Sequence, residues 1–275
     1  MNNKNLHRLF AILAFATAII VYSITVQDSV PFWDCGEFSA ASVWQQVPHP
    51  PGAPLFLMFG KIFEVAIPFG DPGWRINMTS AVSSSFAVLF LYLITVMVIK
   101  NFRKDARTSV GDAIAVYGSA FVGATAFIFS DTFWFNAVES EVYAMSTLFV
   151  SIIIYLMMRW NEEADNPGHE RYLLLIAYLI GLSTGVHLLA ILTIFSIVFL
   201  VYLRKYKVSL KGLLVTGILS LIIFFIIYPF IVKWIPALLA GHSPSRNEAH
   251  EYNTTNSTAL IIVALAFVFG AIGLF

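Results

Sequence analysis

Charged residues are scarce in this sequence. Only 12% of its 275 residues are Asp, Glu, Lys or Arg, against about 25% in a typical soluble domain, whereas 59% are hydrophobic. This excludes an ordinary soluble domain, and we interpret the chain as an integral membrane protein. The 16 basic residues balance the 16 acidic ones, so the net charge gives no indication of a nucleic-acid partner.

Cysteine is almost absent, since Cys35 is the only one in the chain. A single cysteine excludes an internal disulfide bond. No second thiol or histidine pair at ligand spacing stands near it, so we predict no metal site. The simplest interpretation of Cys35 is a small buried residue. A nucleotide-binding motif is also lacking, and we predict no cofactor, while the sequence leaves open whether a divalent ion takes part.

Long apolar runs make up most of the chain. Each of six runs is long enough to cross a bilayer, at residues 9–26, 76–99, 113–129, 142–158, 213–232 and 259–275. A further run, residues 172–203, is much longer than one crossing needs at about 1.5 Å of rise per residue. Basic residues flank it on both sides, so we predict two short crossings with a turn near residues 185–187. The expected fold class is an all-α polytopic membrane protein, a single domain over residues 1–275 with about eight transmembrane helices.

The charges are distributed unevenly between alternate connections. Most basic residues lie before the first run, near residues 100–107, or beside residues 172–203. Because basic loops prefer the cytoplasm, we place the N-terminus there. Most acidic residues then fall outside, many of them in a long first outer loop, residues 27–75. Within it, residues 54–67 predict a short interfacial or re-entrant helix, since about 14 residues with two charges are too few to span a bilayer.

Asp34 and Glu37 are the first candidates for chemistry. Three residues apart, their side chains share one face if the segment is helical. The structural interpretation is a variant of the capping box, with Asp34 as the N-cap of a helix through Trp44 and Glu37 reaching back to it. The functional interpretation is a general base with a supporting carboxylate at a membrane surface. The two interpretations are compatible.

Four further residues are candidates for a site. His49 either satisfies a tight turn or contacts a phosphate or a sugar hydroxyl. Glu141, at the start of the fourth run, is expected to face protein or a polar cavity rather than lipid. His187, at the predicted turn, either makes a structural hydrogen bond or contacts a ligand. Arg75 either anchors a lipid headgroup or holds a phosphate.

Four short motifs occur in order: Phe32-Trp33-Asp34-Cys35-Gly36-Glu37-Phe38, His49-Pro50-Pro51-Gly52-Ala53-Pro54-Leu55-Phe56, Glu141-Val142-Tyr143 and Gly185-Val186-His187. Together they resemble a family of polytopic proteins related to protein O-mannosyltransferases. That family belongs to the GT-C class of glycosyltransferases, which take a sugar from a polyprenyl or dolichyl phosphate outside the cytoplasm. The resemblance implies a GT-C-like bundle whose first outer loop supplies the catalytic carboxylate, at positions matching Asp34 and Glu37. Members usually carry a soluble domain after the membrane part, so we expect the natural protein to continue beyond Phe275.

The resemblance implies an inverting transfer of a sugar, mannose in this family, from a polyprenyl-phosphate donor to a hydroxyl of an exported protein. The expected catalytic residues are Asp34, as general base, and Glu37. The expected substrate-binding residues are Trp33, His49, Arg75, Glu141, Tyr143 and His187. The lipid-linked sugar is a cosubstrate, and the expected partners are this donor, the acceptor protein and membrane lipid, with no nucleic acid. The active site is expected on the non-cytoplasmic side, of the inner membrane if the host is bacterial.

An alternative from another class is a non-catalytic carrier or flippase for polyprenyl lipids or small solutes. Glu141 and His187 would then form an intramembrane path for a proton or a substrate. This alternative predicts ionisable residues near the middle of the bilayer, whereas most acidic residues here are expected at one surface. A structural subunit that docks a missing partner is a third possibility.

Overall fold

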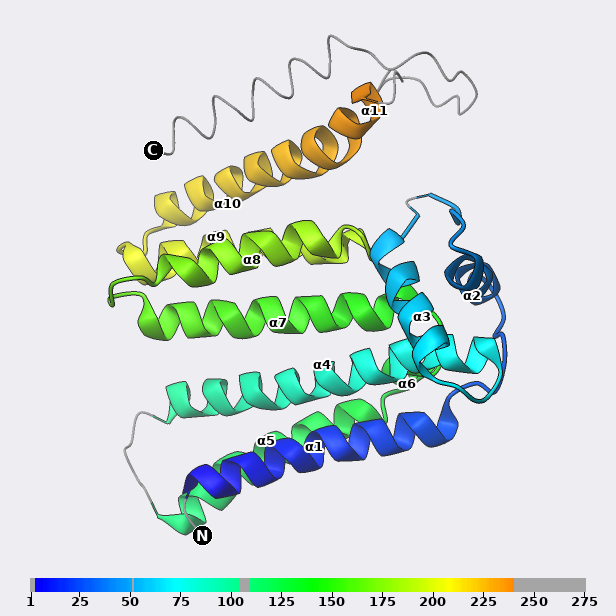
Figure 1. Cartoon of the computed structure of the whole chain (residues 1–275). Coiled ribbons are helices and arrows are strands. Elements are labelled where there is room, and N and C mark those ends of the chain that lie inside the picture. Colours follow the sequence, from blue (N-terminus) through cyan, green and yellow to red (C-terminus); the bar gives the residue numbers. More distant parts are fainter. Residues whose placement is uncertain (1–2, 51, 104–108, 240–275) are drawn as a thin grey trace. The chain divides into compact units, whose positions relative to one another are not determined.

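The computed structural model describes residues 3–50, 52–103 and 109–239, and over these residues the chain forms helices and no strand. Figure 1 shows α1 (Asn3–Thr25), α2 (Cys35–Trp44), α3 (Pro54–Ala66), α4 (Pro72–Phe102), α5 (Val110–Ile128), α6 (Asp131–Ala137), α7 (Val142–Glu163), α8 (Glu170–Ser183), η1 (Leu188–Leu192), α9 (Thr193–Lys205), α10 (Leu210–Phe225), η2 (Ile226–Trp234) and α11 (Ile235–Leu239). The prediction of an all-α fold is confirmed.

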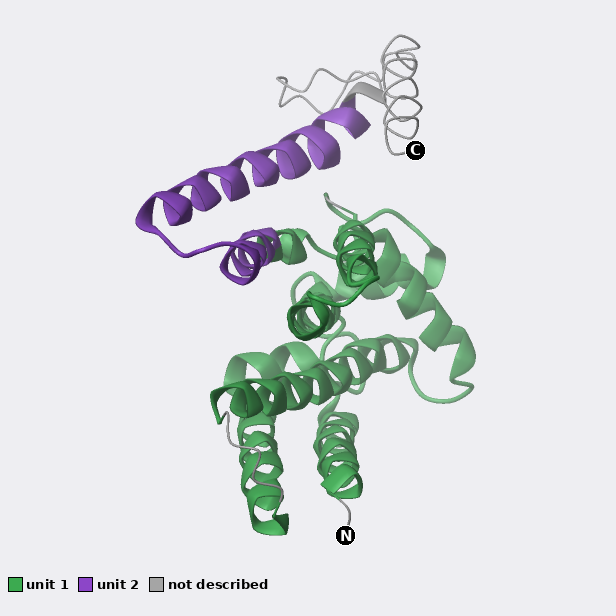
Figure 2. Ribbon diagram, turned by 90° about the vertical axis from the view of Figure 1, so that its left-hand side faces the viewer, with its two compact units in different colours: residues 1–193 green, residues 194–275 purple. Residues whose placement is uncertain are grey.

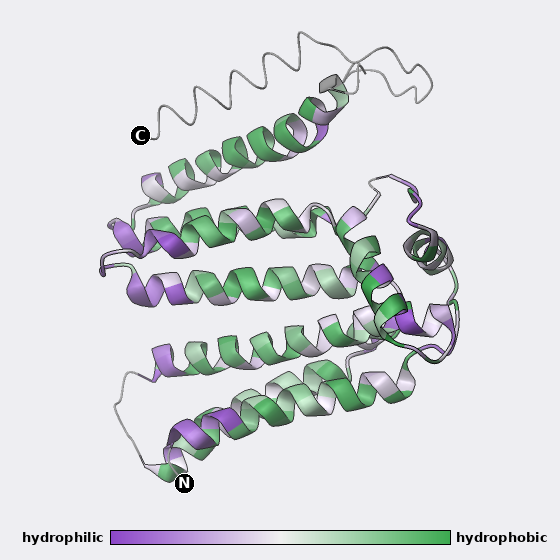
Figure 3. Ribbon diagram, in the orientation of Figure 1, coloured by the Kyte–Doolittle hydropathy of each residue, from purple (hydrophilic) through white to green (hydrophobic). Residues whose placement is uncertain are grey.

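Six helical segments in the described part of the chain are long and apolar enough to cross a membrane. They are α1, α4, α5, α7, Leu188–Lys205 and Leu210–Ala237. In Figure 3 most of their length is coloured as hydrophobic. The chain is therefore a multi-pass membrane protein. The predicted total of about eight crossings also counted residues 259–275, which lie outside the described residues, and a crossing at α8, whose 14 residues are fewer than a full crossing needs.

The long run from residue 172 to residue 203 is interrupted, as its length required. α8 ends at Ser183, and η1 begins at Leu188 after a non-helical step at His187, whose backbone is extended. The break therefore falls at the predicted Gly185-Val186-His187 turn.

The chain divides into two compact units, residues 1–193 and residues 194–275, coloured green and purple in Figure 2. In the second unit, α10 continues into the wider turns of η2, a π-helix that contains Pro229. Proline has no N–H to donate to the preceding turn, and this accounts for the departure from regular α-helical bonding there. The candidate site lies wholly in the first unit.

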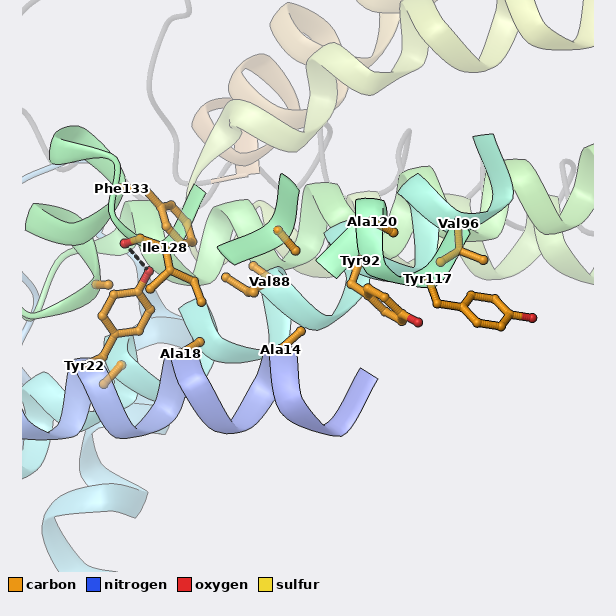
Figure 4. Close-up of a cluster of buried hydrophobic side chains, with 14 of the residues drawn as sticks. Ala14, Ala18, Tyr22, Val88, Tyr92, Val96, Tyr117, Ala120, Ile128 and Phe133 are labelled. Carbon is orange, nitrogen blue, oxygen red and sulfur yellow. Dashed lines mark hydrogen bonds between the residues drawn. The ribbon is translucent and has the colours of Figure 1, made fainter. Parts of the chain in front are cut away.

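The core of the first unit forms where α1, α4 and α5 pack together (Figure 4). Ala14 and Ala18 on α1 and Ala120 on α5 are completely buried, and their small side chains allow the helix backbones to approach closely. Nearby, the hydroxyl of Tyr22 donates to the carbonyl of Ile128 over 3.0 Å. This bond satisfies a buried polar group and ties the end of α1 to the end of α5.

The two ends of the first unit differ in charge. α4 and α7 run opposite to α1, α5 and α8 (Figure 1). The end of α4 with Lys100, the end of α7 with Arg159 and the start of α8 with Arg171 thus lie on the side of the unit where α1 begins. The short helices α2, α3 and α6 lie at the opposite end, so the acidic motifs are separated by the length of the helices from the end with Lys100, Arg159 and Arg171.

Candidate active site

Asp34 and Glu37 do not form the predicted capping box. α2 begins at Cys35 with Asp34 as its N-cap, but the Asp34 side chain accepts no capping hydrogen bond and its backbone is in the αR region, unlike the extended backbone usual for an N-cap. The Glu37 carboxylate points to His49 instead of back to the N-cap. That part of the structural interpretation was wrong, because a partner twelve residues away outcompetes the local one.

Glu37 holds His49 through both of its carboxylate oxygens. Oε1 accepts from the His49 backbone N–H, and Oε2 lies against Nδ1, each over 2.6 Å. The hydrogen bonds from His49 lower the pKa of the Glu37 carboxyl from its ordinary value. Conversely, the hydrogen bond to Glu37 raises the pKa of the His49 imidazole, and the charges of Asp34 and Glu141 add to this effect. The contact thus favours the charged form of both groups.

The other ring nitrogen of His49 faces Asp34. Nε2 lies 3.9 Å from Asp34 Oδ2, which is beyond hydrogen-bonding distance. The side chains of Asp34 and His49 are 62% and 43% exposed, so the space around this pair is open to a substrate. We call Asp34, Glu37 and His49 the exposed cluster.

The connection from α2 to α3 is shaped by residues with positive φ. Gln45 (φ 52°) ends α2, and Gly52 (φ 93°) and Ala53 (φ 40°) precede α3. Left-handed backbone is strained for a residue with a Cβ, so Gln45 and Ala53 indicate a turn enforced by its surroundings. The Phe38 ring packs on the His49 ring at a centroid distance of 5.5 Å and supports it from α2.

Trp33, which precedes the exposed cluster, is a further backbone outlier. Its φ is 62°, and its side chain is 87% exposed. A large residue rarely adopts this conformation, and such strain is more frequent at functional sites than elsewhere. The indole therefore stands free beside Asp34, where a ring-shaped ligand could stack on it.

A second group of ionisable side chains surrounds Cys35, the residue that follows Asp34. The Cys35 thiol is 3.6 Å from Glu139 Oε2 and 3.6 Å from Glu141 Oε1. Cys35 and Glu139 are only 1% and 6% exposed. Burial raises the pKa of both carboxyls and, together with their charges, that of the thiol. We call Cys35, Glu139 and Glu141 the buried cluster.

Serine side chains join the two chain segments of the buried cluster. The Ser140 hydroxyl donates to the Cys35 carbonyl over 3.2 Å and therefore accepts from Ser39, 2.9 Å away. Both serines are buried. These bonds fix the start of α2 against the α6–α7 connection, which is how Glu141 is brought near Asp34 and His49.

The remaining two motifs also reach this end of the unit. The ring of Tyr143 packs against that of His187 at 5.2 Å. The Leu55 N–H donates to the Gly185 carbonyl over 2.7 Å, so the start of α3 is bonded to the turn that carries His187. His187 Nδ1 accepts from the Leu189 N–H, and burial lowers the pKa of its imidazole. The structural hydrogen bond expected as one alternative for His187 is therefore present, and Nε2 remains as a donor.

Arg75 is engaged with backbone rather than with the exposed cluster. Its guanidinium donates to the carbonyls of Glu64, Phe69 and Gly70 over 2.8–3.1 Å and thereby holds the α3–α4 connection. Lys61, the other cation of the first outer loop, contacts Glu64 over 2.7 Å. Contact between Arg75 and a phosphate or headgroup stays a prediction.

Ligand atoms of Asp34, Glu37 and His49 lie within 4.8 Å of one another, a spacing that a metal site would need. Both Glu37 oxygens and His49 Nδ1 are, however, committed to hydrogen bonds. Asp34 still offers both of its carboxylate oxygens and His49 offers Nε2, so the ligand atoms without a described hydrogen bond come from two residues. The arrangement is that of a carboxylate–histidine pair facing a second carboxylate.

Sequence reasoning did not select Glu139 as a site residue, although it named Glu141 two positions later. Among the acidic residues that the structure describes, Glu139 is distinguished by its burial beside Cys35. The only available signal was its place between the apolar Val138 and Ser140 in a connection that also holds Glu141, and this does not distinguish a buried acid from a solvated one. The contact depends on the pairing of residues 35 and 139, which only the fold establishes.

Comparisons with known proteins agree with the motifs. Residues 34–210 match the family described as Protein O-mannosyl-transferase TMEM260 N-terminal domain. The chain is 29% identical over 163 residues to "Protein O-mannosyl-transferase tmem260" of Dictyostelium discoideum, which covers 58% of this chain and 18% of that protein. It is 26% identical over 173 residues to "Protein O-mannosyl-transferase TMEM260" of Mus musculus, covering 63% of this chain and 22% of that protein. The aligned part thus spans about a fifth of each relative's length. No solved structure matches.

Proposed function

Since the chain belongs to the family of the Protein O-mannosyl-transferase TMEM260 N-terminal domain, we propose that it is a membrane glycosyltransferase that moves a mannosyl group from a polyprenyl phosphate to a hydroxyl of an exported protein. One observation carries the proposal. Asp34, His49 and Glu141, from three separate segments of the matched region, converge at one end of the first unit. The relatives' names supply the sugar and the protein acceptor; the lipid-linked donor comes from the resemblance of the motifs to the GT-C class.

Asp34 is the proposed general base. It accepts the proton of the acceptor hydroxyl as the hydroxyl oxygen attacks the anomeric carbon, and the bond from that carbon to the phosphate oxygen breaks with inversion. The phosphate leaves with the electron pair. Because it is already a good leaving group, the protein contributes mainly by positioning and by charge stabilisation. The exposure of Asp34 supports this role, since an acceptor can reach it.

The other candidate residues have supporting roles in the proposal. Glu37 holds His49, and Glu141 stands next to Asp34, where its carboxyl can bond a sugar hydroxyl. Trp33 presents a free indole on which a sugar ring can stack. His187 and Tyr143 offer an N–H and an O–H to the donor phosphate. Arg75 would contribute to phosphate binding only if it exchanged one of its backbone carbonyl partners for the ligand.

The proposed membrane orientation follows from the charge difference between the two ends of the first unit. Lys100, Arg159 and Arg171 would lie in the cytoplasm, and the exposed cluster on the opposite side. A polyprenyl phosphate and an unfolded or exported acceptor are both accessible on that side. Labelling of single cysteines introduced at residue 47 and at residue 103, in a Cys35→Ala background, tests the orientation. An impermeant reagent should reach only residue 47 from the non-cytoplasmic face.

Transfer itself is tested with purified full-length protein, radiolabelled polyprenyl-phosphate mannose and a serine- and threonine-rich acceptor peptide. The expected result is incorporation of label into the peptide by the wild type and not by Asp34→Asn. Normal transfer by a folded Asp34→Asn variant would refute the assignment of the base. Absence of transfer by the wild type with any polyprenyl-phosphate sugar would refute the function.

A further inference from the structure

His49 is the cation closest to the carboxylates of the exposed cluster. Lys61 and Arg75 are the only Lys and Arg residues between positions 26 and 99. Lys61 is paired with Glu64 and also donates to a backbone carbonyl. Arg75 is bonded to three backbone carbonyls. The imidazole of His49 is the basic group that faces Asp34, and the hydrogen bond to Glu37 raises its pKa.

The hydrogen bonds of His49 fix which of its atoms is available. Glu37 takes the backbone N–H and Nδ1, each at 2.6 Å, so the ring cannot turn without losing the second bond. Phe38 packs against the ring and also limits its rotation. Nε2 is left pointing toward Asp34 with no partner at hydrogen-bonding distance among the described contacts of His49. Catalytic histidines are commonly held in this way: a carboxylate bonds one ring nitrogen and thereby directs the other ring nitrogen toward the substrate.

His49 Nε2 and Asp34 Oδ2 are 3.9 Å apart, a distance at which one oxygen atom can form a hydrogen bond to each of them. An oxygen placed between the two atoms can lie about 2.8 Å from each, which is ordinary hydrogen-bond geometry. A hydroxyl suits both neighbours, because it donates one proton and accepts another. Its oxygen accepts from Nε2–H and its proton points at Asp34.

We propose that this gap is the seat of the acceptor hydroxyl, with His49 as the donor that orients the hydroxyl and Glu37 as the residue that positions His49. The inference rests on the proposed transferase function and adds to it the place of the acceptor and a residue that contacts it. The acceptor class is an aliphatic hydroxyl, as in serine or threonine, carried on a peptide.

The step at this seat balances as follows. The hydroxyl oxygen forms a bond to the anomeric carbon, and the bond between that carbon and the phosphate oxygen breaks, leaving its electron pair on the phosphate. The hydroxyl proton passes to Asp34. Nε2–H stays on His49 throughout, so His49 orients the nucleophile without taking its proton. Asp34 then releases the proton to water, to which it is exposed.

Three carboxyl groups face His49, and they give the seat a pH dependence. Asp34 and Glu37 belong to the start of α2, and Glu141 to the start of α7; all three raise the pKa of the imidazole, the hydrogen bond to Glu37 most. Above that pKa the ring keeps the Nδ1 proton for Glu37 and loses Nε2–H, so the acceptor loses its donor. Transfer should therefore fall as the pH rises through the raised pKa of His49.

The test compares four variants of the full-length protein, with labelled polyprenyl-phosphate mannose and a serine peptide. His49→Ala removes the donor, and a charge-assisted hydrogen bond of this kind predicts a loss of about 10- to 100-fold in kcat/KM for the peptide, with the KM for the donor unchanged. His49→Gln keeps an uncharged N–H. It should retain more activity than His49→Ala and should not lose transfer as the pH rises.

Glu37→Gln should shift the loss of transfer to lower pH. Glu64→Gln, which alters the ion pair with Lys61, is the matched control and should leave the pH profile unchanged.

A binding measurement separates this inference from the proposed function. The wild type should bind the serine peptide more tightly than the same peptide with alanine, and His49→Ala should bind the two equally, whether or not transfer is observed. Equal binding of both peptides by the wild type overturns the inference. The inference is also overturned if His49→Ala and His49→Gln lose the same amount of transfer activity and the pH profile of transfer does not change. That result would indicate a structural role for His49. Binding of Mn²⁺ by the wild type that is lost in His49→Ala also overturns the inference, because Nε2 would then be a metal ligand.

Discussion

The exposed and buried clusters share the start of α2, yet their surroundings differ. Glu37 and His49 are about half exposed and stabilise each other's charges, whereas Cys35 and Glu139 are almost completely buried and have no cation beside them among the described contacts. Accordingly the pKa of Glu37 is lowered, while those of Glu139 and Glu141 are raised. Carboxyl groups that the fold brings together at the start of α2 thus have pKa values shifted in opposite directions.

This difference indicates a division of roles. The exposed cluster can bind a substrate and accept a proton, because water and ligands reach it. The buried cluster links the start of α2 to the α6–α7 connection through Cys35, Ser39 and Ser140. It fixes the distance between Asp34 and Glu141, which come from segments more than one hundred residues apart. The following experiments test this comparison, beginning with the largest expected effect.

The first experiment replaces one carboxyl in each cluster by its amide. Asp34→Asn removes the proposed base and should reduce kcat/KM for transfer by about 10²- to 10⁴-fold. Glu139→Gln resembles the protonated form that burial favours, so it should change transfer by less than about tenfold. Thermal unfolding of both variants checks that they are folded. Equal losses in the two folded variants would remove the distinction between the clusters.

The second experiment enlarges the side chain at position 35. Cys35→Leu adds volume where only 1% of the residue is exposed, and overpacking of this kind typically costs about 1–3 kcal/mol in the free energy of unfolding. Cys35→Ser keeps the size and a donor for Glu139 or Glu141 and should cost less. Chemical unfolding in detergent measures both. A Leu variant as stable as the wild type would mean that the buried cluster is not tightly packed.

The third experiment removes the serine link between the segments. Ser140→Ala abolishes the hydrogen bond to the Cys35 carbonyl and leaves that buried carbonyl without this donor, which predicts a loss of about 1 kcal/mol in the free energy of unfolding. Ser119→Ala is a suitable control, since Ser119 is exposed on α5 and caps no helix. If Ser140→Ala affected stability no more than Ser119→Ala but reduced transfer strongly, Ser140 would have a role in catalysis instead.

The fourth experiment compares the two clusters through pH. The lowered pKa of Glu37 means that its contribution to stability is present above its ordinary pKa and is lost as the pH falls through the folded value. The raised pKa of Glu139 has the opposite sign, so its relative contribution is greatest at acid pH and declines as the pH rises through the folded value. Glu37→Gln should therefore reduce the loss of stability as the pH is lowered. Glu139→Gln should reduce the loss of stability as the pH is raised. Unfolding temperatures from pH 3 to pH 9 measure both. An exchange of these two outcomes would mean that the assigned environments are reversed.

Much of the fold follows from local patterns. The apolar runs at residues 9–26 and 142–158 correspond to α1 and α7, because a helix that crosses a bilayer needs such a run whatever surrounds it. The interruption at His187 also followed from local features, the length of the run and the basic residues on both sides of it. The site could be predicted only in part. The motifs identified Asp34, His49 and Glu141, but the expected capping box was wrong, since Glu37 bonds to His49 rather than to its own helix.

The sequence by itself determined that this protein is a helical membrane protein with an acidic connection over residues 27–75, since hydrophobic length and charge are properties of consecutive residues. Only the tertiary structure decided that Glu37 holds His49, that Nε2 faces Asp34, and that Cys35 lies between Glu139 and Glu141. These contacts join positions twelve to more than one hundred residues apart. Their geometry depends on how α2, α3 and α7 pack at one end of the first unit, and no local pattern encodes that packing.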